Sequence, residues 1–157
     1  MKIKVIAPGR TDINYLKQAV EEYEKRIKHY IPFESLSLPS TKGSPNRKIM
    51  AQKVNESEKL LKYIKSSDFV VLLDERGIEL RSREFADFLT RKFNSSVKTL
   101  VFLIGGPFGF DDSIRERADY TLSLSKMTFS HQMIRLFFVE QLYRAMTIIN
   151  NEPYHHE

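Results

Sequence analysis

The strongest structural signal in this chain is the segment TLVFLIGGPFG, residues 99–109. Six apolar or β-branched residues in a row are typical of a strand covered on both faces, as in parallel sheets. Two adjacent glycines follow at once; they allow a ligand to approach the backbone closely, and they also suit a simple turn. The segment therefore predicts a buried parallel strand that ends in a loop able to line a binding site.

Strand and helix patterns alternate on both sides of this segment. Apolar runs predict strands at residues 3–7, 33–38, 68–73 and 120–124, and apolar side chains at helical spacing predict helices at residues 14–30, 50–64, 82–93, 111–117 and 130–149. This order indicates an α/β fold, with a mostly parallel sheet and helices on both of its faces. The chain has 157 residues and neither an internal repeat nor a linker, so we expect a single domain over residues 1–157.

The composition excludes several classes of protein. Apolar residues make up 41% of the chain and charged residues 29%, unlike a disordered or low-complexity sequence. There is no cysteine, and therefore no disulfide, thiolate nucleophile or Cys-type zinc site. The seven residues before the Pro8-Gly9 turn are too few for a signal peptide. We expect a cytoplasmic protein.

One segment, residues 130–149, is apolar enough to raise the question of a membrane helix. It contains Arg135, Glu140 and Arg144. Each of these charges costs about 2.5–3.5 kcal/mol at a bilayer centre, whereas each apolar residue returns only about 0.3–0.6 kcal/mol. The charges outweigh the apolar residues, and we expect a helix that does not cross a membrane.

Charge is distributed unevenly along the chain. Residues 1–66 hold 14 Lys and Arg against 7 Asp and Glu, whereas residues 67–157 hold 11 against 13. A positive half is typical of proteins that bind nucleic acid, and it is also typical of a solvated, Lys-rich helix surface. Charge by itself leaves both interpretations open.

Ligands of open α/β sheets bind beyond the carboxyl ends of the strands, where three loops are predicted. They comprise residues 74–77, 105–110 and 125–130, the last leading into a helix that Thr128 or Ser130 can cap. Free amides at that helix start favour an anion or a ring acceptor. Neither a G-x-G-x-x-G nor a P-loop motif occurs, which argues against dinucleotide and P-loop sites. A further polar loop, residues 39–45, is the best candidate for a mobile segment.

The residues also argue against two common kinds of catalytic site. No nucleophile elbow with a Ser-His-Asp order is present. The four histidines lack the spacing of a metal site, so we expect no metal.

Four blocks of sequence, taken in order, resemble one family over essentially the whole chain. They are residues 104–109, 122–131, 140–145 and 153–155, and residues 22–26 near the start fit as well. The chain is similar to the small bacterial large-subunit rRNA pseudouridine N3-methyltransferases of the RlmH type, within the SPOUT superfamily. The resemblance implies an α/β fold with a C-terminal trefoil knot, a homodimer and S-adenosylmethionine as cofactor. The implied substrate is a pseudouridine in the helix 69 loop of 23S rRNA, within the assembled ribosome.

The resemblance also implies the site residues. The family's cofactor positions match Leu73, Gly105, Leu124, Ser125, Lys126, Met127, Thr128 and Phe129, which lie in or beside the three loops chosen above from sheet topology. His131 and His155 are candidates for accepting the N3 proton, Tyr154 for stacking on the base, and Arg135 for holding a phosphate. His131 could instead cap a helix locally, and Arg135 could form an interface ion pair. His156 stands where the family often has a basic residue, and a contact made there could be weaker.

Three other functions remain open. A SPOUT methyltransferase acting on tRNA would have similar cofactor loops. A ribosome-associated binder with a decayed site would bind no S-adenosylmethionine. A flavodoxin-like FMN protein fits the strand–helix alternation, but the chain lacks a Ser/Thr-rich phosphate loop after the first strand.

Overall fold

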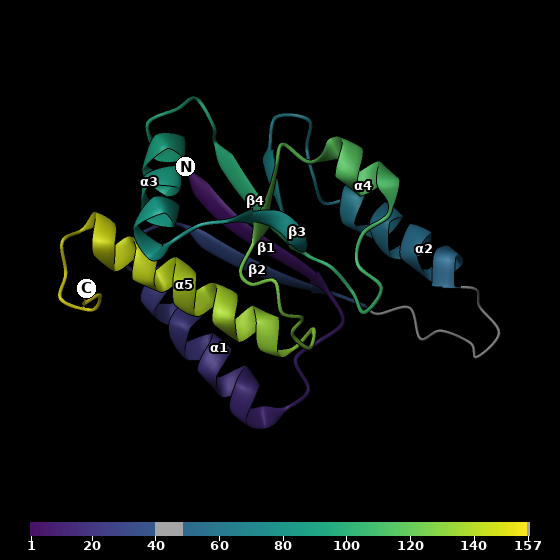
Figure 1. The fold of residues 1–157 in the computed structure, drawn as a ribbon, viewed down its shortest axis with the longest axis horizontal. Helices are drawn as coiled ribbons and strands as arrows, with labels where there is room; N and C mark the ends of the chain where they lie inside the picture. Colours follow the sequence, from purple (N-terminus) through teal and green to yellow (C-terminus); the bar gives the residue numbers. More distant parts are fainter. Residues whose placement is uncertain (40–48, 157) are drawn as a thin grey trace.

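The computed structural model describes residues 1–39 and 49–156 (Figure 1). The elements follow in the order β1 (Lys2–Pro8), α1 (Asn14–Ile27), β2 (Phe33–Leu38), α2 (Ile49–Leu61), β3 (Phe69–Glu79), α3 (Ser82–Phe93), β4 (Thr99–Ile104), α4 (Asp112–Arg117), β5 (Tyr120–Ser123) and α5 (Met133–Ile149). This order confirms the predicted α/β alternation. Most of the loop expected at residues 39–45 lies outside the described residues.

The five strands form one parallel sheet in the order β2-β1-β4-β3-β5. β4 lies in the middle, and its residues 100–104 are at most 2% exposed, as its unbroken apolar run predicts. Leu73 on β3 lies opposite Ile104 on β4. The end of β4 therefore lies beside the point where the pairing of β3 with β4 ends, at one edge of the sheet.

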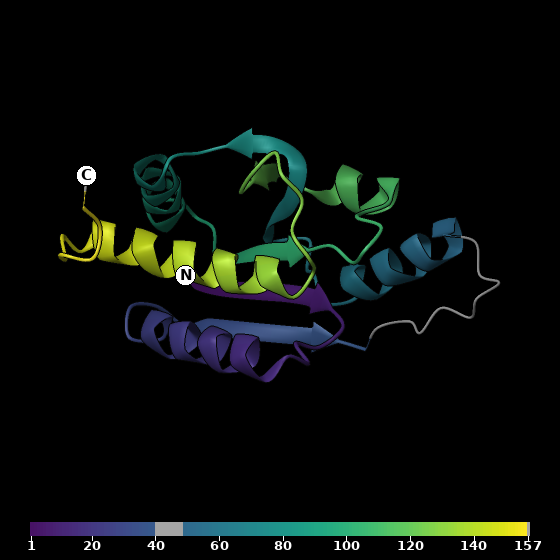
Figure 2. The ribbon, with the colours of Figure 1, turned by 60° about the horizontal axis from the view of Figure 1, so that its bottom comes forward.

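Helices cover both faces of the sheet, which confirms the predicted layering (Figures 1 and 2). α1, α3 and α5 pack on one face, around a cluster that includes Phe102 and Phe138. α2 and α4 pack on the other face, around a cluster that includes Leu103 and Phe110. Phe102 and Leu103 are adjacent on β4 and point to opposite faces, because side chains alternate along a strand. The trefoil knot stays a prediction from the resemblance.

The segment at residues 74–77 differs from the simple loop expected there. It is an excursion within β3, because Leu73 and Ile78 both pair with Leu122 of β5. The chain returns to β5 at Gly77, where an added Cβ would lie 2.6 Å from the backbone of Leu122. A glycine lets the two backbones approach this closely, and the bulge leaves Asp74 and Arg76 at the edge of the sheet.

The final helix begins later than its sequence pattern suggests. We expected it from residue 130, but α5 starts at Met133. The hydroxyl of Ser130 accepts a hydrogen bond from the N–H of Met133 at 3.2 Å, so Ser130 acts as the predicted cap from outside the helix. The chain between β5 and α5 is therefore a longer loop than expected, and we call residues 124–132 the entry loop.

Candidate functional site

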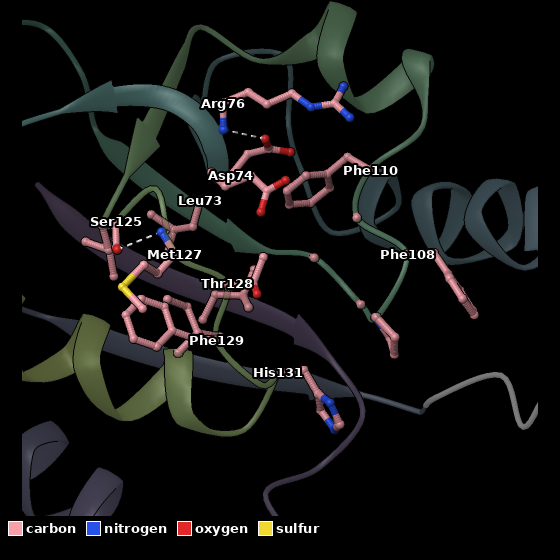
Figure 3. A pocket seen from close by; sticks show the side chains of 18 of the residues that line it. Leu73, Asp74, Arg76, Phe108, Phe110, Ser125, Met127, Thr128, Phe129 and His131 are labelled. Carbon is pink, nitrogen blue, oxygen red and sulfur yellow. Dashed lines mark hydrogen bonds between the residues drawn. The ribbon is translucent and has the colours of Figure 1, made fainter.

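A cavity of about 370 Å³ lies at the carboxyl edge of the sheet (Figure 3). Its lining comes from the β3 excursion, from residues 104–110 and from the entry loop, with Lys53 of α2 and Arg115 of α4 closing one side. The volume falls within the range of small-molecule sites, about 300–1,000 Å³. The three loops predicted from sheet topology therefore meet around one cavity.

Apolar side chains form much of the lining, and several of them are exposed. Ile104 and Leu124 provide the inner surface, while Met127 and Phe129 stand at the opening, 77% and 39% exposed. The ring of Phe129 packs against that of Phe137 on α5, with 4.9 Å between centroids. These exposed side chains give the entry loop an apolar outer surface that nothing in this chain covers among the described residues.

The opposite side of the cavity is polar and carries both signs of charge. Oδ2 of Asp74 accepts a hydrogen bond from Nη2 of Arg115 at 2.7 Å, and Oδ1 accepts one from the backbone N–H of Arg76 at 3.0 Å. Burial by itself would raise the pKa of Asp74, but these two donors outweigh it, and the pKa lies below its ordinary value. Asp74 therefore stays ionised at neutral pH and holds α4 against the β3 excursion.

The glycine loop, residues 105–109, is a closed turn. The N–H of Gly109 donates to the carbonyl of Gly106 at 3.0 Å, and Gly109 has φ of 72°, in the left-handed region that favours glycine. A Cβ added at Gly106 would collide with Oε2 of Glu56, a buried carboxylate on α2. Within the described residues this Oε2 has no hydrogen-bond partner. The carboxylate of Glu56 thus packs against the glycine loop. Sequence patterns do not predict this contact, because α2 is distant from the loop in the chain.

The predicted cofactor residues all line this cavity except Lys126. The side chain of Lys126 is 86% exposed, and its Nζ lies 3.9 Å from Oε2 of Glu79. The start of the entry loop is held by Ser125, whose hydroxyl accepts a hydrogen bond from the N–H of Met127 at 2.9 Å and whose carbonyl accepts one from the hydroxyl of Ser123.

The four predicted catalytic residues are not all brought together. His131 lines the cavity and is exposed at its opening (Figure 3). Tyr154 and His155 line neither this cavity nor a second one described below. The Tyr154 hydroxyl lies 3.1 Å from Oε1 of Glu140 and 3.3 Å from the Tyr23 hydroxyl, and burial, with these two neighbours, raises the pKa of Tyr154. Nδ1 of His155 is buried without a hydrogen-bond partner among the described residues.

Arg135 does not line this cavity. It is buried, and its five N–H groups are hydrogen-bonded to the carbonyls of Pro8, Gly9 and His131 and the hydroxyls of Thr11 and Ser37. Burial lowers the pKa of Arg135, and the charge of Asp12 partly opposes this effect. Each guanidinium nitrogen thus has a partner within this chain, and Arg135 lines the second cavity, which is described next.

A second cavity, of about 560 Å³, lies between α1, the sheet and α5. Its lining mixes cations such as Lys17 with carboxylates such as Glu24, and burial raises the pKa of Glu24. It lies away from the ends of β3 and β5, and only Ile104 lines both cavities. We therefore take the first cavity as the candidate site.

The described part of the chain holds neither a membrane-spanning helix nor a metal site. Among residues 1–39 and 49–156, no helix is long and apolar enough to cross a membrane. The same residues contain no group of three or more His, Cys, Asp or Glu that could hold a metal ion.

Comparisons with known proteins agree with the resemblance seen in the sequence. A family model described as "Predicted SPOUT methyltransferase" matches residues 1–155. Two relatives, both called ribosomal RNA large subunit methyltransferase H, come from Parabacteroides distasonis and Phocaeicola vulgatus. They are 51% and 52% identical over 157 residues, which is the whole of each chain. A probable methylase family protein from Haemophilus influenzae Rd KW20 has a similar fold, with a TM-score of 0.53 and 12% identity over 99% of this chain and 70% of that one. The chain belongs to the SPOUT methyltransferase family.

Proposed function

We propose that this chain is an S-adenosylmethionine-dependent methyltransferase of large-subunit rRNA, which methylates N3 of a pseudouridine in the helix 69 loop of 23S rRNA. One observation carries the proposal. Three loops, distant in sequence, converge on one cavity whose lining contains the positions implied for the cofactor, Leu73 and Gly105 among them. The names of the relatives support rRNA of the large subunit as the substrate.

The cavity suits this cofactor chemically. Ile104, Leu124 and Phe129 offer apolar surface to a purine ring, and the glycine loop offers backbone N–H and carbonyl groups. Asp74 and Arg115 offer charges of both signs to the zwitterionic amino-acid part. When bound, S-adenosylmethionine supplies a methyl group on a positively charged sulfur. The protein then has to orient the acceptor base and to remove one proton.

We propose that His131 accepts that proton. N3 of pseudouridine is itself the nucleophile and must lose its proton, so the site needs an acceptor that is neutral near pH 7. Imidazole is the side chain that most often accepts a proton in this way. His131 is exposed at the opening of the cavity, where an acceptor base would enter, and His155 is the alternative. Tyr154 would provide a ring on which the base can stack. The remaining catalytic effect comes from positioning.

The enzyme is proposed to act as a homodimer, because the tail and the cavity lie apart in one chain. The C-terminal tail lies beyond the end of α5 that is opposite the entry loop (Figure 1). If both serve one base, the tail must come from a second subunit. Exposed apolar side chains at the cavity, including Met127 and Phe137, would be covered by that subunit.

The ribosome is the proposed partner. A base in an RNA loop costs less to extrude than a base within a duplex. In the single proposed domain, residues 1–157, the basic residues concentrated in residues 1–66 would contact the RNA phosphates directly. We place the enzyme in the cytoplasm, where ribosomes are.

A methyl-transfer assay tests the proposed function. Purified ribosomes, protein-free 23S rRNA and bulk tRNA are each incubated with the protein and S-adenosylmethionine labelled in the methyl group. We expect label in ribosomes and none in tRNA. Label in tRNA would favour a different SPOUT methyltransferase, whereas calorimetry without heat of cofactor binding would indicate a ribosome-associated binder without an active site.

A further inference from the structure

Two residues at the start of α5 fasten the entry loop to the turn between β1 and α1. The first is Gln132, whose side-chain carbonyl accepts hydrogen bonds from the backbone N–H groups of Asp12 and Ile13, at 3.0 and 3.2 Å. The N-cap position of α1 is occupied by Ile13, which has no side-chain oxygen to accept such bonds. The backbone just before α1 is therefore held by a residue that lies about 120 positions further along the chain.

The second residue is Arg135, in the first turn of α5. Its Nη2 donates to the carbonyls of Pro8 and Gly9, at 2.5 and 3.0 Å, and its Nε donates to the carbonyl of His131 at 3.2 Å. Gly9 has φ of 76°, in the left-handed region, so the end of β1 can turn two successive carbonyls toward one guanidinium. Arg135 thus joins the backbone of the entry loop directly to the end of a central strand.

The free energy needed to bury the charge of Arg135 suggests that this residue does more than fill space in the core. Its exposure is 6%, and within residues 1–39 and 49–156 no carboxylate forms an ion pair with it. Taking a charge out of water without an ionic partner is unfavourable, and apolar side chains of similar volume usually serve stability as well or better. The planar guanidinium, however, can bind several carbonyls in a fixed arrangement that neither an apolar side chain nor Lys reproduces.

The entry loop depends on this attachment because it has little other support. Residues 126–131 are exposed, and the hydrogen bonds of Ser125 fix only the beginning of the loop. At the far end, Ser130 caps α5, while Gln132 and Arg135 tie that end to the sheet and to α1. Between these ends lie Met127, Thr128 and Phe129, which line the cavity.

We propose that Gln132 and Arg135 form a clamp that preorganises the entry loop for S-adenosylmethionine. Both are positioning residues, and neither contacts the cofactor or the RNA. The clamp acts by keeping the loop in its binding conformation before the cofactor arrives, which lowers the entropy lost on binding. This inference rests on the proposed function, because it concerns the affinity of the same cavity for its cofactor.

The test uses the full-length protein and two clamp variants, Arg135→Met and Gln132→Leu, with Phe88→Leu as the control. Phe88 is buried on α3, where its ring packs against Phe85 and Tyr120, and it lines neither cavity, so its variant reports the effect of lost stability. Calorimetry should give a Kd for S-adenosylmethionine raised at least about tenfold in Arg135→Met and about threefold in Gln132→Leu, and changed less than about twofold in the control. Without cofactor, amide hydrogen exchange should become faster at residues 8–13 and 124–132 in the clamp variants only.

A second readout separates the clamp from a phosphate contact. If Arg135 bound a phosphate, its loss would make the plot of log binding constant against log salt concentration for ribosome binding less steep, by about one released counterion. The clamp predicts an unchanged salt dependence together with a higher KM for the cofactor and a nearly unchanged kcat. If Arg135→Met does not fold, Arg135→Lys and Gln132→Leu carry the same test.

Three results would overturn the clamp. They are an unchanged cofactor Kd in both variants, a Kd raised equally in Phe88→Leu, and hydrogen exchange at residues 124–132 that stays at the wild-type rate. A wild-type protein that binds no S-adenosylmethionine would refute the proposed function instead. Hydrogen exchange would then still decide whether Gln132 and Arg135 order the loop.

Discussion

Two segments that line the same cavity are held in contrasting ways. The glycine loop is a closed turn with a proline at its centre, and it rests on the buried carboxylate of Glu56. The entry loop carries exposed apolar side chains and is tied down mainly at its two ends, by Ser125 and by the clamp. The glycine loop is thus supported within the chain, whereas the entry loop has an exposed apolar surface that the proposed second subunit would cover.

The largest expected effect comes from disrupting the glycine loop with Gly106→Val. Its Cβ would collide with Oε2 of Glu56, so the larger Val side chain must displace this buried carboxylate from its place against the glycine loop. We expect a loss of unfolding free energy of up to about 3 kcal/mol, typical of overpacking, and no measurable cofactor binding. Chemical denaturation and calorimetry measure the two effects.

The matched control for this change removes the carboxylate. In a Glu56→Ala background, Gly106→Ala should cost much less than it does in the wild type, because the two side chains then share the freed space. Equal costs in both backgrounds would mean that Glu56 does not support the glycine loop.

The next effect concerns the exposed side of the entry loop. Phe137 is 40% exposed and packs on Phe129, so Phe137→Glu should leave the fold intact. In a dimer that covers this surface, the buried charge should weaken association by at least about 2 kcal/mol, or roughly thirtyfold in the dimer Kd. Sedimentation velocity measures this change. A wild-type protein that is monomeric at micromolar concentration would contradict the proposed interface.

A smaller effect is expected from deleting residues 154–157. Tyr154 packs edge-on against Tyr143 and bonds with Tyr23 and Glu140, so the tail is fixed to its own chain more firmly than a short terminus suggests. The deletion should cost about 1 kcal/mol of stability. Ribosome methylation should fall at least about tenfold, or about 1.4 kcal/mol of barrier, with cofactor affinity nearly unchanged. Methylation at the wild-type rate would remove Tyr154 and His155 from the site.

The smallest effect is a dependence of stability on pH. Because the pKa of Asp74 is lower in the folded protein than in the unfolded chain, its contribution is complete above about pH 4 and is lost as the pH falls through the folded value. Asp74→Asn should cost at most about 1 kcal/mol at pH 7, since its ion pair borders an open cavity. Denaturation at pH 6 and pH 3 should show a smaller loss of stability in the variant than in the wild type.

The same contrast explains what the sequence predicts and what it does not. The apolar run of β4 and the glycines after it predict the position of the glycine loop, because burial on both faces of a parallel sheet leaves a strong local pattern. The excursion at residues 74–77 is not apparent from local sequence, since it depends on the approach of Gly77 to β5. The roles of Glu56, Gln132 and Arg135 depend on contacts with residues far away in the chain. Hydrophobic periodicity does not carry such information.

Mass spectrometry of helix 69 fragments tests the central claim most directly. Ribosomes that lack the modification are incubated with S-adenosylmethionine and either the wild-type protein or Gly106→Val, and the fragments are then compared. The proposed function predicts one added methyl group, on N3 of a pseudouridine in the helix 69 loop, with the wild type and none with the variant. A methyl group on another nucleotide, or unmodified fragments with a wild-type protein that binds the cofactor, would contradict it.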